Sequence, residues 1–130
     1  MSIERVNPES LGAPAGFSHA TVGRGTMVFL AGQTSMDSSG AIVGDDVVAQ
    51  FRTALTRLLD ALRAAGGTPA DLASLTIYIT DMDDYKAHAR EIGQVWKELA
   101  GRDYPAMAGI GVTRLWDAEA LVELQGFAVI

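Results

Sequence analysis

Cysteine is absent from the 130-residue sequence, and histidine occurs only twice. Without cysteine the chain has no disulfide framework, no thiolate metal site and no thiol nucleophile. The two histidines, His19 and His88, lack the HExxH-like spacing of a zinc site. We therefore predict no metal, and we expect His88, within YKAHAREI, to lie on or near the solvated face of a helix.

Long apolar runs and clusters of positive charge are also missing. No apolar run approaches the roughly 18–20 residues that cross a bilayer, and the N-terminal MSIERVNPES lacks the basic and apolar regions of a signal peptide. We therefore expect a cytoplasmic protein with no membrane partner. The formal net charge is −6 and the ten basic residues are scattered. Binding to a phosphate backbone requires clustered basic residues, so this composition disfavours nucleic acid as a partner.

The rest of the composition is that of a globular protein, with 48% hydrophobic and 20% charged residues. The length predicts a single domain over residues 1–130. Apolar residues at three- and four-residue steps predict helices over Asp45–Ala65 and from about Asp84 to Leu99. β-formers bounded by turns predict strands at 18–22, 27–34, 41–43, 75–80 and 120–130, the first two paired as a hairpin. The stretch DYPAMAGIGV, at 103–112, predicts a further strand that begins at its proline. This order predicts an α+β fold, with both helices packed on one face of a mixed sheet.

The other face of this sheet is predicted to be apolar. We expect it to carry Tyr78, Met107, Leu121 and Phe127, which together are too apolar for a wetted surface. A second copy of the same chain is the partner that we expect to cover it. The two glycines of GIGV, at residues 109–112, would then let a neighbouring backbone approach closely.

Two familiar kinds of catalytic motif are excluded. Ser18 and His19 are adjacent in a predicted strand, so their side chains point to opposite faces and cannot act together as nucleophile and base. The glycine pairs in VGRGTM and GIGVTR do not open a helix and cannot present backbone amides to a phosphate. Glu123 is more informative, because strand alternation puts its carboxylate on the same face as Phe127. It is either a carboxylate in water at a strand edge or an acid in a pocket, placed there to transfer a proton.

Five segments, in fixed order, carry a family resemblance. They are GAPAGFSHA, VFLAGQT, FRTALTRLLDALRAAGGTPADLASLTIYITDMDDY, YPAMAGIGV and ALVELQGFAVI. Together they cover nearly the whole chain and resemble the RidA family of reactive intermediate deaminases, also called YjgF-like or L-PSP endoribonuclease-like proteins. The resemblance implies a chorismate-mutase-like fold and a homotrimer whose sheets form an inner barrel, with small-molecule clefts between subunits. It also implies hydrolysis of enamines and imines to keto acids and ammonia without a cofactor.

The residues of the family's cleft carry over only in part. The resemblance calls for an arginine after Pro-Ala that clamps the substrate carboxylate, and this sequence has Met107 there. A thioether cannot replace the bidentate contact between a guanidinium and a carboxylate. Three further positions depart from the family: Phe17 stands for a tyrosine, Ala31 for a serine and Ala89 for an asparagine.

Other residues of the cleft are retained or offer substitutes. Gly32, Gln33 and the glutamate that helps to place the attacking water, Glu123, match the resemblance. On an unbroken strand Arg114 points away from the face of Met107, whereas a bulge at one of the intervening glycines would bring it to the same face. His19, where many family members have glutamine, is a candidate for a new polar group near the cleft.

The sequence leaves two functions open. One is an enzyme acting on an imine, enamine or related small metabolite without a carboxylate, with Glu123 and His19 as acid and base. The alternative is a non-catalytic, small-ligand-binding or regulatory trimer. In both cases the predicted ligand-binding residues are Phe17, Ala31, Gly32, Ala89, Met107 and Trp116. Ribonuclease activity is disfavoured by the acidic charge and the missing nucleophile.

Overall fold

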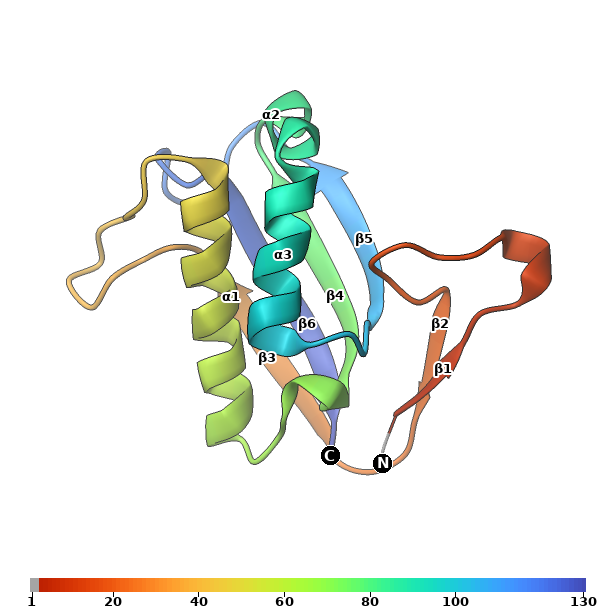
Figure 1. The fold of residues 1–130 in the computed structure, drawn as a ribbon. Coiled ribbons are helices and arrows are strands. Elements are labelled where there is room, and N and C mark those ends of the chain that lie inside the picture. The colour runs from red at the N-terminus through yellow and green to blue at the C-terminus, as the bar shows by residue number, and fades with distance from the viewer. Residues whose placement is uncertain (1–2) are drawn as a thin grey trace.

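The computed structural model describes residues 3–130 as a twisted sheet covered by helices, with a hairpin beside it (Figure 1). The elements in chain order are β1 (Ile3–Val6), β2 (Ala20–Gly23), β3 (Met27–Gln33), α1 (Val47–Ala64), β4 (Leu72–Ile79), α2 (Met82–Ala87), α3 (Ala89–Ala100), β5 (Ala106–Gly111) and β6 (Val122–Val129). Short 3-10 turns lie at Glu9–Leu11 and Pro69–Asp71. The α+β class and the mixed sheet are therefore as predicted.

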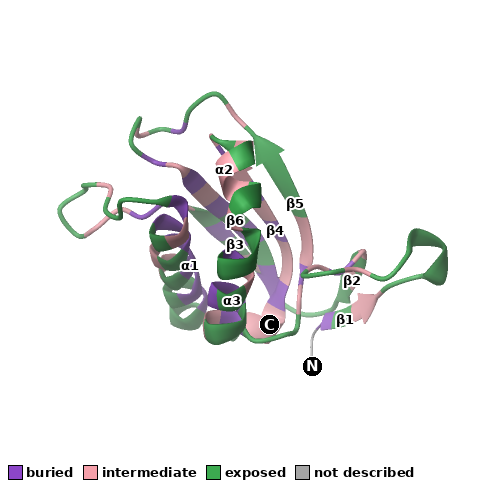
Figure 2. Ribbon diagram, turned by 45° about the horizontal axis from the view of Figure 1, so that its top comes forward, coloured by how far each residue is buried: buried purple, intermediate pink, exposed green. Residues whose placement is uncertain are grey.

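The main sheet has the strand order β3-β6-β4-β5. The β3–β6 and β6–β4 pairs are antiparallel, and the β4–β5 pair is parallel. Helices α1 and α3 cover one face of this sheet, as the sequence predicted (Figure 1). β5 is an edge strand, and most of its length is exposed (Figure 2).

The core lies between α1, α3 and the sheet. Asp46 caps α1, because its carboxylate accepts a hydrogen bond from the Ala49 amide at 2.8 Å. The apolar stripe of the helix then places Leu55, Leu58 and Leu62 against the sheet, all fully buried. The predicted first helix is thus confirmed almost residue for residue.

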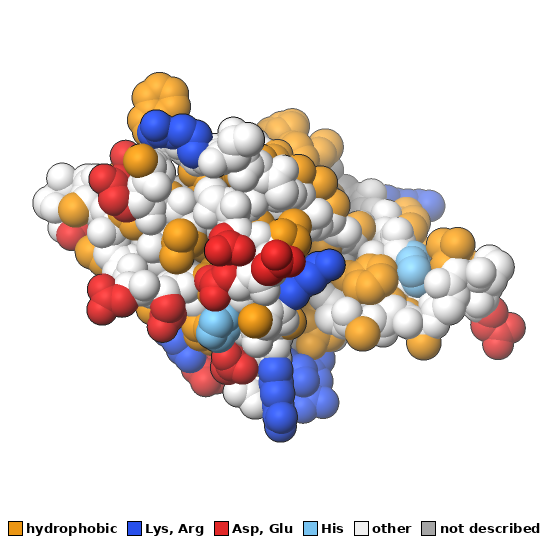
Figure 3. Space-filling view, turned by 90° about the horizontal axis from the view of Figure 1, so that it is seen from above, with side chains coloured by type: hydrophobic (Ala, Val, Ile, Leu, Met, Phe, Trp, Pro, Cys, Tyr) orange, Lys and Arg blue, Asp and Glu red, His pale blue; other side chains and the backbone are white. Residues whose placement is uncertain are grey.

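The second predicted helix is present but divided. α2 ends and α3 begins at His88, whose backbone departs from helical geometry with φ −109° and ψ 15°. The imidazole Nδ1 of His88 lies 2.8 Å from the Asp84 carbonyl oxygen, and this contact raises the pKa of the histidine. Acidic side chains surround one histidine on this end of the molecule (Figure 3).

Two predicted strand assignments are wrong. β2 pairs with β1 in a separate two-stranded sheet, and it does not form a hairpin with β3. After the turn that follows β2, Thr26 exchanges two backbone hydrogen bonds with Ile130. β3 therefore pairs with the long strand β6 instead. Residues 41–43 contribute only an isolated bridge between Ile42 and Met36, because Asp37 folds the preceding segment into a tight turn.

The open face of the sheet carries Tyr78 and Phe127, as predicted, together with Phe29. Phe29 is 72% exposed, and its ring packs edge-on against Phe127 at 5.5 Å. The prediction for Met107 is wrong, because Met107 is paired with Leu75 and both face the helices. Leu121 precedes β6 and packs partly buried against the core, so it does not belong to the open face either.

Candidate functional site

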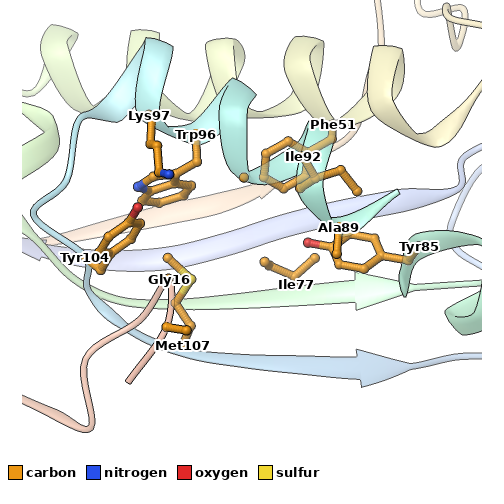
Figure 4. A pocket seen from close by; sticks show the side chains of 12 residues that line it. Gly16, Phe51, Ile77, Tyr85, Ala89, Ile92, Trp96, Lys97, Tyr104 and Met107 are labelled. Atoms are coloured by element: carbon orange, nitrogen blue, oxygen red, sulfur yellow. The ribbon is translucent and has the colours of Figure 1, made fainter. Parts of the chain in front are cut away.

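A pocket of about 340 Å³ lies between α3, β5 and the loop that precedes β2 (Figure 4). We call it the α3 pocket. Its wall is aromatic: Tyr85, Trp96 and Tyr104 line it, and the last two rings stack at 6.2 Å. The Met107 side chain extends from β5 into the space beneath the helix (Figure 4). Lys97 is the charged residue among those that line this pocket.

A second pocket of about 260 Å³ adjoins the first along β5. We call it the β5 pocket. The two pockets share four lining residues, Gly16, Ile77, Tyr85 and Met107, and the β5 pocket adds Phe17 and Gly109. No charged side chain of the described chain lines the β5 pocket. Met107 therefore stands where the two pockets meet, in apolar surroundings.

Burial affects two polar groups of the α3 pocket. Desolvation raises the pKa of the Tyr85 phenol to about 12. Like an ordinary tyrosine, it is neutral at physiological pH and can donate a hydrogen bond. Trp96 is 4% exposed, and within residues 3–130 its indole Nε1 has no hydrogen-bond partner.

Glu123 lies on the opposite side of the sheet. It is paired with Tyr78 on β4, while its neighbours Val122 and Leu124 point into the core beneath the helices. In the described chain its carboxylate has no ion-pair partner and accepts no hydrogen bond. Glu123 is half-buried on an otherwise mostly apolar face, so its charge is available to a ligand or to a partner.

Gly32 lies beside Glu123, and Ala31 precedes it in β3, at a break in the sheet register. Leu30 pairs with Gly126 and Gln33 with Leu124, so β3 holds one residue more than β6 over this stretch. A Cβ on Gly32 would lie 2.9 Å from the Cδ and Oε2 atoms of Glu123. The glycine therefore makes room for the carboxylate at this bulge.

The predicted cleft residues thus form two groups. The first group lies on the helix side of the sheet and comprises Phe17, Ala89 and Met107, which line the pockets. The second group lies on the open side and comprises Ala31, Gly32 and Glu123. The sheet separates the two groups within one chain.

Trp116 and Arg114 lie in the loop between β5 and β6. Trp116 is 91% exposed and lines neither pocket of its own chain. The Arg114 guanidinium donates hydrogen bonds to the carbonyl oxygens of Leu115 and Trp116, each at 3.1 Å. Arg114 is thus bound to its own loop and does not reach Met107.

His19 is held in the N-terminal segment. Its Nε2 lies 3.0 Å from the Gly12 carbonyl oxygen, and its ring meets Phe17 edge-on at 5.0 Å. The neighbouring Ser18 is buried and donates its hydroxyl to the Tyr104 carbonyl oxygen at 2.7 Å. His19 therefore adjoins Phe17 but does not line either pocket.

Several pocket residues were not predicted as functional. Tyr85 and Trp96 belong to the apolar stripe of the second helix, which the sequence assigns to the core, and Lys97 looks like an ordinary solvated residue beside them. Arg57 is a further cation that the sequence did not single out, and its Nε donates a hydrogen bond to the Gln33 Oε1 at 3.1 Å. The repeated aromatic residues on one helix face were the available signal for the α3 pocket.

Within residues 3–130, no three side chains of histidine, aspartate or glutamate lie together in a way that would hold a metal ion. None of the helices there has the length and apolar character of a membrane span.

Comparisons with known proteins agree with this fold. The family model described as Endoribonuclease L-PSP matches residues 8–130. The RutC family protein PH0854 of Pyrococcus horikoshii is 30% identical over 96% of both chains. A 2-iminobutanoate/2-iminopropanoate deaminase of Capra hircus is 30% identical over 78% of this chain and 72% of its own. The structure of the Rid-family protein YyfB from Yersinia pestis superimposes with a TM-score of 0.89, at 33% identity and over the full length of both chains. The chain therefore belongs to the Endoribonuclease L-PSP family, which is the RidA family that its sequence resembles.

Proposed function

We propose that the chain forms a homotrimer and binds, in clefts between its copies, a small imine- or enamine-type metabolite that has no carboxylate. Each cleft combines the β5 pocket of one copy with the Glu123 side of the next. The observation that carries this proposal is the position of Met107, in apolar surroundings at the junction of the two pockets.

The assembly is supported by the division of the site. Met107 and Glu123 lie on opposite sides of their own sheet, so a second copy is needed to bring such groups together. The edge strand β5 also supports it, because alanines at Gly109 and Gly111 would meet no closer contact than 3.6 Å within the chain. No contact within one copy requires these residues to be small, whereas their small size would let a neighbouring copy approach closely.

The choice of ligand is supported by the charges around Met107. The relatives named as deaminases act on 2-imino acids, whose carboxylate requires a cationic partner. Arg114 is occupied by its own loop, and Lys97 lines the α3 pocket but not the β5 pocket. Burying a carboxylate beside Met107 without a partner would cost several kcal/mol, so the cleft should reject it.

Glu123 supplies the proton chemistry in this proposal. Water adds to the carbon of a protonated C=N bond, and the carboxylate accepts a proton from that water and returns it to the nitrogen. As the C–N bond of the carbinolamine breaks, the carboxylate takes the hydroxyl proton and passes it to the departing ammonia. One iminium ion and one water thus give one carbonyl product and one ammonium ion. No cofactor enters these steps.

The second candidate is a trimer that binds its ligand without turnover. It is favoured by the concentration of changes in the cleft, where Phe17, Ala31 and Ala89 depart from the family pattern together with Met107. Those three residues have no polar side-chain group with which to position a water.

The test is a competition assay. An amino-acid oxidase generates 2-iminopropanoate in the presence of semicarbazide, and a carboxylate-free imine of similar size is followed in parallel. We expect no acceleration with 2-iminopropanoate and measurable hydrolysis of the carboxylate-free imine. Fast hydrolysis of 2-iminopropanoate would overturn the proposal, and binding without turnover of either imine would favour the second candidate.

A further inference from the structure

Trp116 is the most exposed large apolar side chain of the described chain, at 91%. Single exposed apolar side chains are common on protein surfaces. The backbone that carries this indole is held in place, because Arg114 donates hydrogen bonds to the carbonyl oxygens of Leu115 and Trp116. The loop is also held at its far end, where Gln50 bonds the Glu119 carbonyl and the Leu121 amide. Several hydrogen bonds therefore hold the loop that presents this indole to solvent.

The loop presents Trp116 at the same end of the sheet as Glu123. It leaves β5 at Gly111 and enters β6 at Val122, and both of these residues pair with Ile79 at the end of β4. Glu123 is the next residue of β6. A neighbour that meets Glu123 on this end of the sheet is therefore also within reach of the loop that carries Trp116.

We propose that Trp116 of one copy covers the β5 pocket of its neighbour and, with Glu123 of the same copy, makes the cleft selective for a small cation, an iminium or ammonium ion. This inference rests on the proposed function, since it uses the cleft between copies. It assigns Trp116 as a specificity-determining residue supplied in trans, and Arg114 as the residue that positions it.

The β5 pocket and the Trp116 indole have complementary surfaces. The β5 pocket is lined mostly by apolar residues, and none of the described residues that line it is charged, so a flat aromatic ring is a suitable cover. The face of an indole ring attracts a cation through the ring quadrupole. Glu123 adds a carboxylate that is unpaired within the described chain, and Met107 adds no positive charge to oppose the ligand.

The absence of native cysteine allows a direct test by cross-linking. Differently tagged chains carrying Met107→Cys or Trp116→Cys are co-expressed and treated with a short bis-maleimide, so that any link between the two tags joins two copies. A parallel pair combines Met107→Cys with Glu123→Cys. Ala64→Cys, exposed at the end of α1, replaces the second partner as the matched control and is expected to give no link.

The outcomes separate the two proposals. Links from position 107 to both 116 and 123 support this inference. A link to 123 without one to 116 overturns the role of Trp116 and leaves the cleft between copies intact. No link to either position, in protein that is folded, contradicts the proposed function itself.

The cation selectivity is measured with the indole as reporter. The emission of the wild type minus that of Trp116→Phe isolates Trp116, which is exposed and not required for the fold of one chain. We expect this signal to be shielded from acrylamide and to respond to tetramethylammonium at about fivefold lower concentration than to tert-butanol, a neutral molecule of similar size, as about 1 kcal/mol of cation–π attraction implies. Equal responses, or full accessibility to acrylamide, would overturn the inference.

Discussion

Two glycines on adjacent strands give opposite predictions when each is replaced by alanine. Gly32 on β3 and Gly126 on β6 both have a backbone that any residue adopts, so only the added Cβ matters. On Gly126 the Cβ would lie 2.6 Å from the Ser74 carbonyl oxygen, whereas real Cβ atoms keep at least 3.0 Å. Strands β4 and β6 would have to separate by at least 0.4 Å, the difference between these two distances.

The expected stabilities follow from what each Cβ meets. Gly126→Ala pushes against backbone, and overpacking of this kind costs about 1–3 kcal/mol. Gly32→Ala pushes against the movable end of Glu123, at 2.9 Å. Holding the Glu123 side chain about 30° away from a rotamer costs about 0.5–1.5 kcal/mol. Replacing a strand glycine by alanine returns about 0.5–1 kcal/mol. Gly32→Ala should therefore be nearly neutral for the free energy of unfolding.

Urea denaturation of both variants at one protein concentration measures this difference, because assembly makes stability depend on concentration. Gly32→Ala should keep the wild-type midpoint but lose ligand binding to the same extent as Glu123→Gln, since both displace the charge. Gly126→Ala should lose stability and keep binding per folded molecule. Equal destabilisation by the two alanines would refute the placement of Glu123 against Gly32.

Three further predictions concern the pockets and the loop. Met107→Arg should raise turnover of 2-iminopropanoate at least about tenfold in the semicarbazide assay, because a charge-assisted pair contributes about 1.5–3 kcal/mol; no gain would mean that the other changes in the cleft also prevent the reaction. The Tyr85 phenol should ionise near its raised pKa of about 12 in an absorbance titration. Because burial favours the neutral phenol, its contribution to the free energy of unfolding is complete below pH 10. This contribution, about 2–3 kcal/mol, is lost as the pH rises to about 12. The loss should be absent in Tyr85→Phe. Gln50→Ala should destabilise the chain by about 2–3 kcal/mol in urea, because Gln50 is 3% exposed and its amide satisfies the Gly44 and Glu119 carbonyls and the Leu121 amide; an unchanged midpoint would contradict the role of Gln50 in holding the loop.

The helices and the central strands could be predicted from local pattern. The leucine stripe of α1 and the alternation of β4 and β6 each encode their own burial, so their boundaries were nearly correct. Strand pairing could not be read in the same way, because the partner of β3 is set by β6, almost a hundred residues later. Local turn signals favoured a hairpin of β2 with β3, but β3 pairs with the longer strand β6.

The same limit applies to the candidate site: local pattern placed some of its residues correctly, and those that depend on strand pairing were misplaced. Parity within β6 correctly placed Glu123 with Phe127 on the open face. Met107 was assigned to the wrong face, because its orientation depends on its register with Leu75 on a parallel neighbour, which sequence spacing does not reveal. The α3 pocket was missed because Tyr85 and Trp96 look like core residues and the pocket exists only where Tyr104 and the segment before β2 meet them.

Light scattering of the purified protein tests most directly whether the site is built between copies. Met107 and Glu123 lie on opposite sides of their own sheet, and in the proposed function a neighbouring copy supplies the second side of the cleft. The proposed assembly predicts a mass of three copies of the 13.7 kDa chain. A mass of 13.7 kDa at the concentrations used for ligand binding would contradict the account, since one chain cannot bring the two sides of the cleft together.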